Sequence, residues 1–204
     1  AVGARPIWLY ASSHAGEETL AARLHTDLAE TYPDLLTMIV PRHPERREHI
    51  QTELKTMGLN ITLRSENKDL PDSKTEIYIA DTLGELGLFY NLSPIAMIGR
   101  SFSDDGGGGH NPIEAAQLNC AVLTGPNVQY QKQLFEEMFQ SSAAYQVITE
   151  QELLAQLTLY LSNHSLLNEA IQSAQTFSKS KNDIIHHVME NIQPLLPFTK
   201  KKAA

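Results

Sequence analysis

The chain has 204 residues, of which 42% are hydrophobic, and its 16 Lys and Arg against 24 Asp and Glu give a formal net charge of −8. This size suffices for one α/β domain with its own core, and the acidic balance argues against broad nucleic-acid binding, which needs a surface that neutralises phosphates. The lone Cys120 forms no internal disulfide, no apolar run approaches the about 20 residues of a membrane span, and residues 1–6 lack the features of a signal peptide.

Short apolar runs, which predict strands, alternate with stretches of helical periodicity. The predicted strands are residues 7–11, 35–40, 60–63, 77–80, 95–98, 121–123 and 145–148. Helices are expected between them, except between the third and fourth strands, where residues 65–74 predict a polar loop. From Glu150 onward the pattern is helical until Pro194 and Pro197. The alternation predicts an α/β fold with a doubly wound, mostly parallel, Rossmann-like sheet. In such a sheet a ligand binds at the carboxyl ends of the strands.

The loop after the first predicted strand, residues 12–18, combines small residues, hydroxyls and the start of a helix. A free helix N-terminus at this edge favours an anion. Plain capping is the alternative, with Ser13 or His14 at the cap and Glu17 in the first turn.

The loop after the second strand is rich in arginine, with Arg42, Arg46 and Arg47 inside six residues. The last two stand at the start of a predicted helix, where positive charge opposes the helix dipole. A bound phosphate resolves this conflict, and so does a surface pair with Glu45 or Glu48.

The third loop, residues 81–86, has the spacing of a capping box between Thr82 and Glu85. Gly84 is harder to explain by capping alone, because glycine in a first turn costs up to about 1 kcal/mol against alanine. Its lack of a side chain allows another group to approach the backbone.

The fourth loop contains four consecutive glycines, residues 106–109, before Asn111 and Pro112. Such a run offers backbone N–H groups to an anion or to a hydroxyl-rich ligand. Asn111 is the expected N-cap. Glu114 either completes a capping box with Asn111 or accepts hydrogen bonds from a vicinal diol such as a ribose.

Metal and cofactor chemistry finds no support in the sequence. His186 and His187 point to different faces of one predicted helix, and Cys120 has no second cysteine. His14, His43 and His110 share the strand-end edge, where each serves as a neutral hydrogen-bonding group. We therefore expect no metal ion and no cofactor.

Taken together and in this order, the four loops resemble the C-terminal half of the bacterial 3-deoxy-D-manno-octulosonic acid (Kdo) transferases of lipopolysaccharide synthesis. The matching segments are residues 13–18 (SHAGEE), 40–46 (VPRHPER), 81–90 (DTLGELGLFY) and 108–114 (GGHNPIE). The likeness extends over about residues 6–139. It implies a GT-B glycosyltransferase whose Rossmann-like C-terminal domain binds the nucleotide-sugar donor CMP-Kdo.

The resemblance also implies roles for residues of the four loops. Pro41 and Arg42 meet the cytidine monophosphate, and Glu114 binds the ribose diol. The full set implied to bind CMP-Kdo is Pro41, Arg42, Leu83, Gly84, Glu85, Asn111, Pro112, Ile113 and Glu114. Further candidates are Ser13, His14, His43, Gly108, Gly109 and His110. One departure concerns Asp104 and Asp105, which are unfavourable beside an anion unless they point away.

The resemblance places the catalytic base in an N-terminal domain, which also docks on the membrane and receives the lipid A precursor. No such domain is expected in this chain, so we expect residues 1–197 to be a donor-binding domain and residues 198–204 a disordered tail. The missing initiator Met agrees with a piece of a longer protein. We expect this piece to be soluble and inactive alone, and the full-length protein to work at the cytoplasmic face of the inner membrane.

Two other interpretations stay open at this point. The chain could be part of another GT-B transferase, or of an epimerase, that uses a UDP-sugar. It could also be a non-catalytic doubly wound binding module in which every loop serves only to cap a helix.

Overall fold

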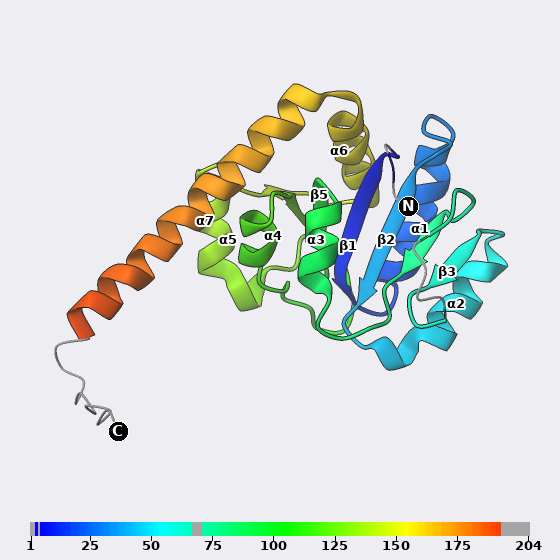
Figure 1. Cartoon of the computed structure of the whole chain (residues 1–204), viewed down its shortest axis with the longest axis horizontal. Helices are drawn as coiled ribbons and strands as arrows, with labels where there is room; N and C mark the ends of the chain where they lie inside the picture. The colour runs from blue at the N-terminus through cyan, green and yellow to red at the C-terminus, as the bar shows by residue number, and fades with distance from the viewer. Residues whose placement is uncertain (1–2, 4, 67–70, 193–204) are drawn as a thin grey trace, which may run out of the picture.

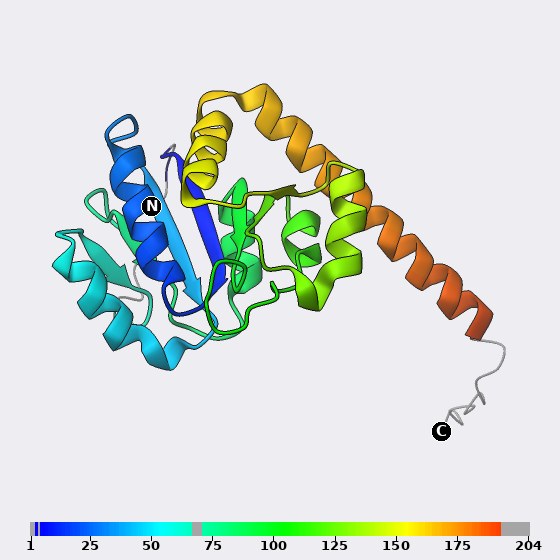
Figure 2. The ribbon, with the colours of Figure 1, turned by 180° about the vertical axis from the view of Figure 1, so that it is seen from behind.

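The computed structural model describes residue 3, residues 5–66 and residues 71–192 of the chain. Within them a seven-stranded sheet lies between two layers of helices (Figures 1 and 2), and every strand pair is parallel. The predicted fold class is therefore confirmed. The predicted tail, residues 198–204, and the expected end of regular structure at Pro194 and Pro197 lie outside the described residues.

All seven predicted strands are present, with bounds shifted by one or two residues at most. They are β1 (Ile7–Ser13), β2 (Leu36–Pro41), β3 (Ile61–Leu63), β4 (Ile77–Ile79), β5 (Ile95–Ile98), β6 (Ala121–Thr124) and β7 (Tyr145–Gln146). Their order across the sheet is β3-β4-β2-β1-β5-β6-β7. Strand β1 thus lies in the middle, between β2 and β5.

The helices of the described residues follow the strands as predicted. They are α1 (Glu17–Ala29), α2 (Arg47–Thr56), α3 (Leu86–Leu92), α4 (Ile113–Gln117), α5 (Lys132–Gln140), α6 (Glu150–Ser162) and α7 (His164–Ile192). Pro44, expected to open α2, instead starts a short 3-10 turn (Pro44–Arg46) ahead of it.

Both faces of the sheet are buried, which explains why its strands are almost continuously apolar. Along β1, Trp8 and Tyr10 enter one core layer, and Ile7, Leu9 and Ala11 enter the other. Helices α1, α2 and α6 pack on the first layer, while α3, α4 and α5 pack on the second. Figure 1 shows α3 and α4 in front of the sheet, and Figure 2 shows α1 in front from the opposite side.

Helix α7 is the longest element, with 29 residues. Its first part packs against α4 and β6, and its second part projects away from the sheet (Figures 1 and 2). No helix in the described part of the chain is long and apolar enough to cross a membrane.

The strand order creates a topological switch point between β1 and β5. After β1 the chain turns to α1 and pairs β2 with one side of β1, whereas β5 pairs with its other side and leads to α4 on the opposite layer. Because the two connections diverge, a crevice forms outside the carboxyl ends of these strands. This edge lies at the bottom of Figure 1, where the arrowhead of β2 points.

Candidate functional site

A hollow of about 490 Å³ occupies the switch point at the ends of β1 and β5. Side chains from three loops line it: His14, Ala15, Arg42, His43, Arg46, Arg100, Asp105 and His110. The structure thus brings together four predicted site residues that are far apart in the sequence, namely Arg42 and the three histidines.

The loops after β1 and β5 are joined by the carboxylate of Glu17, which is 1% exposed. Its Oε2 accepts hydrogen bonds from the backbone N–H of His14 (2.9 Å) and Arg100 (2.8 Å). Its Oε1 accepts from the N–H of Ser101 and of Phe102, both at 2.9 Å. Burial raises the pKa of Glu17, and these four bonds to its charged form oppose that rise. Two sides of the hollow are therefore one hydrogen-bonded unit.

The alternative interpretation of the first loop, capping of α1 by Ser13 or His14, is wrong. The N-cap is Gly16, whose φ of 88° lies in the left-handed region that glycine adopts without strain. The Ser13 hydroxyl instead donates to Oε1 of Glu18 at 2.9 Å. The Ser13 hydroxyl thus binds a side chain of the first turn of α1, whereas the His14 ring lies against Asp105 and His110.

Arg46 finds a partner that the sequence did not indicate. Its guanidinium donates to both carboxylate oxygens of Glu18 on α1, at 2.8 and 3.3 Å, and the Glu18 side chain is fully buried. Neither Glu45 nor Glu48 takes that position, and Glu45 pairs with His43 at 3.3 Å. The charge of Arg46 is thus compensated from a neighbouring helix, and no phosphate is needed to explain its place.

Arg42 differs from the other arginines of the hollow. Its backbone N–H donates to the carbonyl of Ser13 at 2.9 Å, which fixes the loop beside the end of β1. Its exposed guanidinium has no hydrogen bond or ion pair within the described part of the chain, whereas Arg46 is bound to Glu18 and Arg100 lies 3.4 Å from Asp105. Arg42 therefore presents an uncompensated planar donor to the hollow.

Asp105, expected to be unfavourable beside an anion unless it points away, does not point away from the hollow. Its Oδ2 lies 2.8 Å from Nδ1 of His14, and its Oδ1 accepts from the Ser103 hydroxyl at 2.7 Å. Nε2 of His14 in turn lies 3.0 Å from Nε2 of His110. The hydroxyl of Ser103 and the imidazole of His14 hold the pKa of Asp105 below its usual value. Asp105 is thus the carboxylate end of a hydrogen-bonded chain.

His14 and His110, the two histidines hydrogen-bonded in series with Asp105, are neutral near pH 7. Burial lowers the pKa of His14, although the bond to Asp105 opposes this effect. Burial lowers the pKa of His110 to about 4, assisted by the nearby His14, Arg42 and Arg100. The expectation of neutral hydrogen-bonding groups agrees with these directions.

The glycine run has a structural purpose that the sequence did not reveal. The N–H groups of Gly108 and Gly109, expected to be free for an anion, both donate to the carbonyl of Arg100 at 3.1 Å. A Cβ on Gly108 would lie 2.4 Å from the ring of Tyr130, and Gly109 has a φ of 70°. The glycines thus allow the loop to fold back on itself.

The start of α4 is also built differently from the prediction. Pro112 rather than Asn111 is the N-cap, and the side chain of Asn111 accepts from the N–H of Ile113 at 2.9 Å. Glu114 is exposed and has no hydrogen bond to Asn111. One carboxylate oxygen of Glu114 lies 3.3 Å from the position that a Cβ on Gly87 of α3 would take. Because Gly87 has no side chain, this carboxylate can lie beside the third loop.

In the third loop the predicted pair of Thr82 and Glu85 is present but does not cap a helix in the expected way. Glu85 is itself the N-cap of α3, and its carboxylate accepts from the Thr82 hydroxyl and from Arg64, the latter at 2.8 Å. These bonds lower the pKa of Glu85, with Arg64 as the largest cause. Leu83 is 79% exposed, and Gly84 has a φ of 81°. The loop thus presents an apolar side chain and bare backbone.

The predicted residues therefore fall into two groups. The hollow contains Arg42 and the three histidines, His110 of the fourth loop included, whereas Pro41 is buried at the end of β2 and the other predicted residues of the third and fourth loops lie outside the lining. Sequence reasoning did not propose Arg100 as a site residue. A signal for it exists, because an arginine directly follows Gly99 at the end of a strand, and the structure gives it a φ of 61°.

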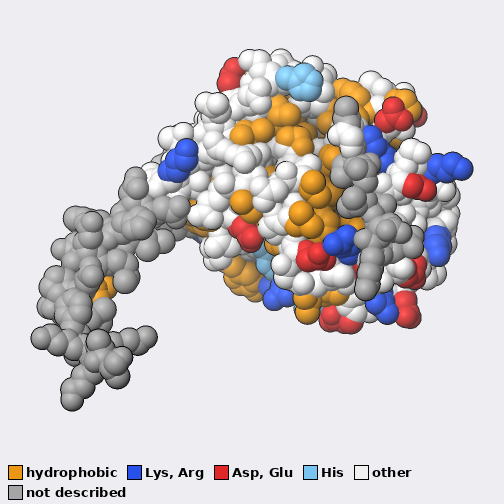
Figure 3. Space-filling view, in the orientation of Figure 1, with side chains coloured by type: hydrophobic (Ala, Val, Ile, Leu, Met, Phe, Trp, Pro, Cys, Tyr) orange, Lys and Arg blue, Asp and Glu red, His pale blue; other side chains and the backbone are white. Residues whose placement is uncertain are grey.

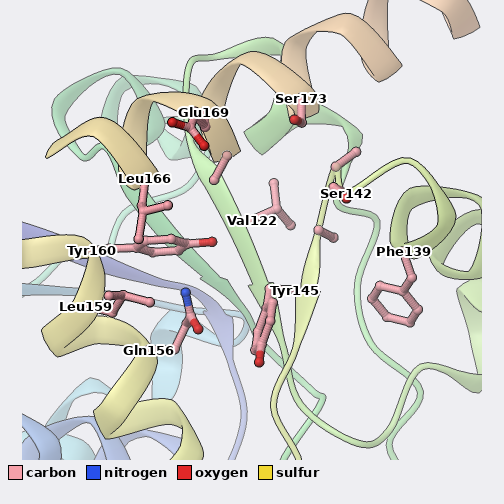
Figure 4. A pocket seen from close by; sticks show the side chains of 13 residues that line it. Val122, Phe139, Ser142, Tyr145, Gln156, Leu159, Tyr160, Leu166, Glu169 and Ser173 are labelled. Carbon is pink, nitrogen blue, oxygen red and sulfur yellow. The ribbon is translucent and has the colours of Figure 1, made fainter. Parts of the chain in front are cut away.

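A second hollow, of about 590 Å³, lies beside β7 (Figure 4). Tyr160 and Leu166 project into it from α6 and α7, opposite Tyr145. Its lining holds one charged side chain, Glu169, which accepts a hydrogen bond from Ser165 at 3.1 Å. None of the residues predicted to bind CMP-Kdo lines this second hollow. No group of His, Cys, Asp or Glu arranged to hold a metal ion is found among the described residues.

The chain is similar to curated proteins over most of its length. It is 38% identical over 192 residues to the probable 3-deoxy-D-manno-octulosonic acid transferase, mitochondrial, of Arabidopsis thaliana, a match that covers 93% of this chain and 42% of that protein. It is 33% identical over 194 residues to the 3-deoxy-D-manno-octulosonic acid transferase of Rickettsia felis, covering 94% and 41%. The chain belongs to the Kdo transferase family. It spans about two fifths of the length of these relatives. No protein-family model matches it.

Among solved structures, this Kdo transferase chain is similar to a C-terminal domain of the family. The crystal structure of the C-terminal CMP-Kdo binding domain of WaaA from Acinetobacter baumannii superposes with a TM-score of 0.81 at 26% identity, covering 86% of this chain and 90% of that one. UDP-GlcNAc 2-epimerase from Neisseria meningitidis gives a TM-score of 0.58 at 14% identity, which shows a shared fold alone. The expected fold class, the C-terminal half of a GT-B glycosyltransferase, is confirmed.

Proposed function

We propose that this chain binds CMP-Kdo as the donor-binding domain of a Kdo transferase, and that the whole enzyme transfers Kdo to a lipid A precursor with inversion. The observation that carries the proposal is the uncompensated guanidinium of Arg42 in a hollow at the switch point of the sheet. Membership of the family supports the choice of sugar, and the name of the neighbour from Acinetobacter baumannii supports the choice of nucleotide.

The phosphate of the donor occupies the hollow. Arg42 meets it with two parallel N–H groups, a geometry that matches phosphate oxygens. Arg100 adds a second positive charge from the loop after β5. Its Nε lies 3.4 Å from the Asp105 carboxylate, so the remaining N–H groups of its guanidinium can donate to the phosphate. The N-terminus of α1, which begins at Glu17 beside the hollow, adds a favourable dipole.

The nucleoside extends from the hollow over the third and fourth loops. Glu114 accepts hydrogen bonds from the ribose hydroxyls, because its carboxylate is exposed and unpaired within the described residues. The base lies against Leu83 and the backbone at Gly84, where no Cβ restricts its approach. Glu85 contributes through its backbone, since its side chain is bound to Arg64.

The remaining steps of the reaction belong to the part of the relatives that this chain does not span. Inverting transfer needs a base beside the acceptor hydroxyl and stabilisation of the leaving group on the other side of the anomeric carbon. We assign only the second to this chain. The base, the lipid A acceptor site and the contact with the cytoplasmic face of the inner membrane are assigned to an N-terminal domain.

Titration calorimetry with CMP, UMP and UDP-N-acetylglucosamine tests this proposal. We expect measurable binding of CMP, weaker binding of UMP and no Kdo transfer by this chain alone. A clear preference for uridine nucleotides would favour a UDP-sugar enzyme, the epimerase alternative included. Absence of binding to every nucleotide would favour a non-catalytic module, and Kdo transfer by the isolated chain would contradict the assignment of the base.

A further inference from the structure

The chain of hydrogen bonds in the hollow has a defined direction. Asp105 is ionised at neutral pH, because the Ser103 hydroxyl and the His14 imidazole lower its pKa. A carboxylate only accepts, so His14 must donate from Nδ1 across the 2.8 Å contact. The neutral ring of His14 then accepts at Nε2, and the partner at 3.0 Å, Nε2 of His110, must be the donor.

This direction leaves one ring nitrogen without a hydrogen and without a hydrogen-bond partner, because the other bare nitrogen, Nε2 of His14, accepts from His110. Nδ1 of His110 carries a lone pair and has no hydrogen bond within the described part of the chain. A proton added there turns His110 into an imidazolium and keeps both existing bonds. A proton added anywhere else on the two rings would break a bond, so Nδ1 of His110 is the natural place for it.

The charges around His110 oppose that proton while the hollow holds no anion. Arg42 and Arg100 face the ring from two different loops, and Asp105 is the one carboxylate that counteracts them. Burial, the neighbouring His14 and these two arginines together lower the pKa of His110 to about 4. The ring therefore stays neutral over the physiological range.

The ring of His14 is also neutral, because burial lowers its pKa. His14 faces Asp105, Arg100 and the ring of His43, whose centroid lies 5.7 Å away. The other charged groups nearby are bound to fixed partners: Arg46 to Glu18, and Glu17 to backbone N–H groups. The proton balance of the hollow is thus decided by the two rings, Asp105 and the arginines.

We propose that the hollow binds a proton together with the phosphate of its ligand, and that this proton resides on Nδ1 of His110. A phosphate between Arg42 and Arg100 compensates their charges and adds negative charge beside the ring, which reverses the balance that keeps His110 neutral. Because linkage is reciprocal, a ligand that favours the proton binds more tightly as the pH falls. The inference rests on the proposed function, and it states that nucleotide binding is accompanied by the uptake of a proton.

The charge of the phosphate decides how strongly the two events are linked. A phosphodiester, as in a nucleotide sugar, carries one negative charge, whereas a phosphomonoester with a second pKa of about 6 carries up to two near pH 7. The extra charge appears on the nucleotide when it is released from the sugar. A proton on His110 therefore stabilises the leaving nucleotide more than the donor, which is the difference that catalysis needs.

Nuclear magnetic resonance of the histidine rings tests the proposal directly. We expect free His110 to remain in the neutral Nε2–H form between about pH 5.5 and 8. At saturation with CMP its titration midpoint should rise by at least about one pH unit. Cytidine 5′-methyl phosphate, a permanent monoanion, should raise it less. His110→Gln identifies the resonance.

Calorimetry in two buffers of different ionisation enthalpy gives an independent measurement. We expect net uptake of up to about one proton per CMP near pH 6. His110→Gln should abolish the protein's share of this uptake, and Asp105→Asn should diminish it by removing the carboxylate that fixes His14. His49→Gln is the matched control, because His49 is exposed on α2 and pairs with Glu53 at 3.5 Å. The nuclear magnetic resonance spectrum of each variant shows whether the fold is retained.

The outcomes separate this inference from the proposed function. CMP binding without a change at His110, or uptake that persists in a folded His110→Gln variant with the monoanionic ester, overturns the inference and leaves donor binding standing. Absence of CMP binding overturns both.

Discussion

The hollow at the switch point and the hollow beside β7 are close in size and opposite in chemistry. The one beside β7 is the larger, at about 590 Å³ against 490 Å³, but its sides are mainly apolar and it holds one carboxylate. The one at the switch point is lined by three arginines and three histidines. Apolar side chains also spread over the face that carries α3 and α4 (Figure 3). The site that we propose therefore rests on an uncompensated charge at the strand ends, and not on volume or exposed apolar area.

The largest expected effect tests the hydrogen-bonded support of the switch-point hollow. Glu17→Ala removes the acceptor of four backbone N–H groups, two in buried and two in partly buried hydrogen bonds, and an unsatisfied buried group costs about 1–3 kcal/mol. We expect the free energy of unfolding in urea to fall by at least about 3 kcal/mol. Glu150→Ala is the control, because it loses a partly exposed pair with Arg23 and should cost about 1 kcal/mol or less. Equal losses in the two variants would contradict the role of Glu17.

The next effect concerns the uncompensated cation. Arg42→Ala should weaken CMP binding by about 10- to 100-fold, since charge-assisted hydrogen bonds contribute about 1.5–3 kcal/mol. Calorimetry measures this change. Arg23→Ala, which removes an arginine paired with Glu150 away from the hollow, should leave the affinity within about two-fold. An unaltered affinity in Arg42→Ala would remove the main support for a phosphate in this hollow.

Glu114 allows a test with a matched ligand. Glu114→Ala should weaken CMP binding by about ten-fold, because the ribose hydroxyls lose a charged acceptor. The wild-type chain should discriminate between CMP and 2′-deoxy-CMP, and the variant should lose that discrimination. Glu136→Ala, an exposed carboxylate paired with Lys132 on α5, is the control. Discrimination that persists in Glu114→Ala would place the diol elsewhere.

The pH dependence of stability has a definite sign. The folded-state pKa of His110 is lowered, to about 4, so the folded protein binds fewer protons than the unfolded chain below about pH 6.5. The stability that the neutral His110 ring allows is fully present above about pH 6.5. It is lost as the pH falls toward 4, because the unfolded chain takes up the proton first. Because the ring is partly exposed, we expect about 1 kcal/mol or less by pH 5. Urea unfolding should show a smaller loss in His110→Gln than in the wild type.

The smallest effect compares two exposed leucines, one near each hollow. Leu83→Ala should weaken CMP binding by about two- to five-fold, as apolar contact with the base is reduced. Leu166→Ala removes the same atoms at the hollow beside β7 and should leave the affinity unchanged. A loss in Leu166→Ala that equals the loss in Leu83→Ala would erase the distinction between the two hollows.

The architecture was predictable from the sequence because it depends on local pattern. Buried parallel strands such as residues 35–40 are short uninterrupted apolar runs, and the amphipathic helices between them show their periodicity directly. The identity of the loops at the strand ends was predictable for the same reason, since each loop follows its strand in the chain.

The contacts between loops were not predictable, because they join residues that are far apart in the sequence. Arg46 and Glu18 are 28 positions apart, and Asp105 and His14 are 91 apart. Local rules assigned Glu17 to a helix cap, yet its carboxylate binds a loop 83 to 85 residues away. Its local bond to the N–H of His14 is kept beside these distant ones, so the local rule found only part of what Glu17 does.

The carboxylate of Glu17 has one more consequence, which concerns rates. It holds the loops after β1 and β5 together before any ligand arrives, so binding at this hollow orders little additional backbone. A pre-organised site leaves little conformational change to slow association, and ligands of similar charge should then associate at similar rates. Differences in affinity among nucleotides should therefore reside in how long each one stays bound.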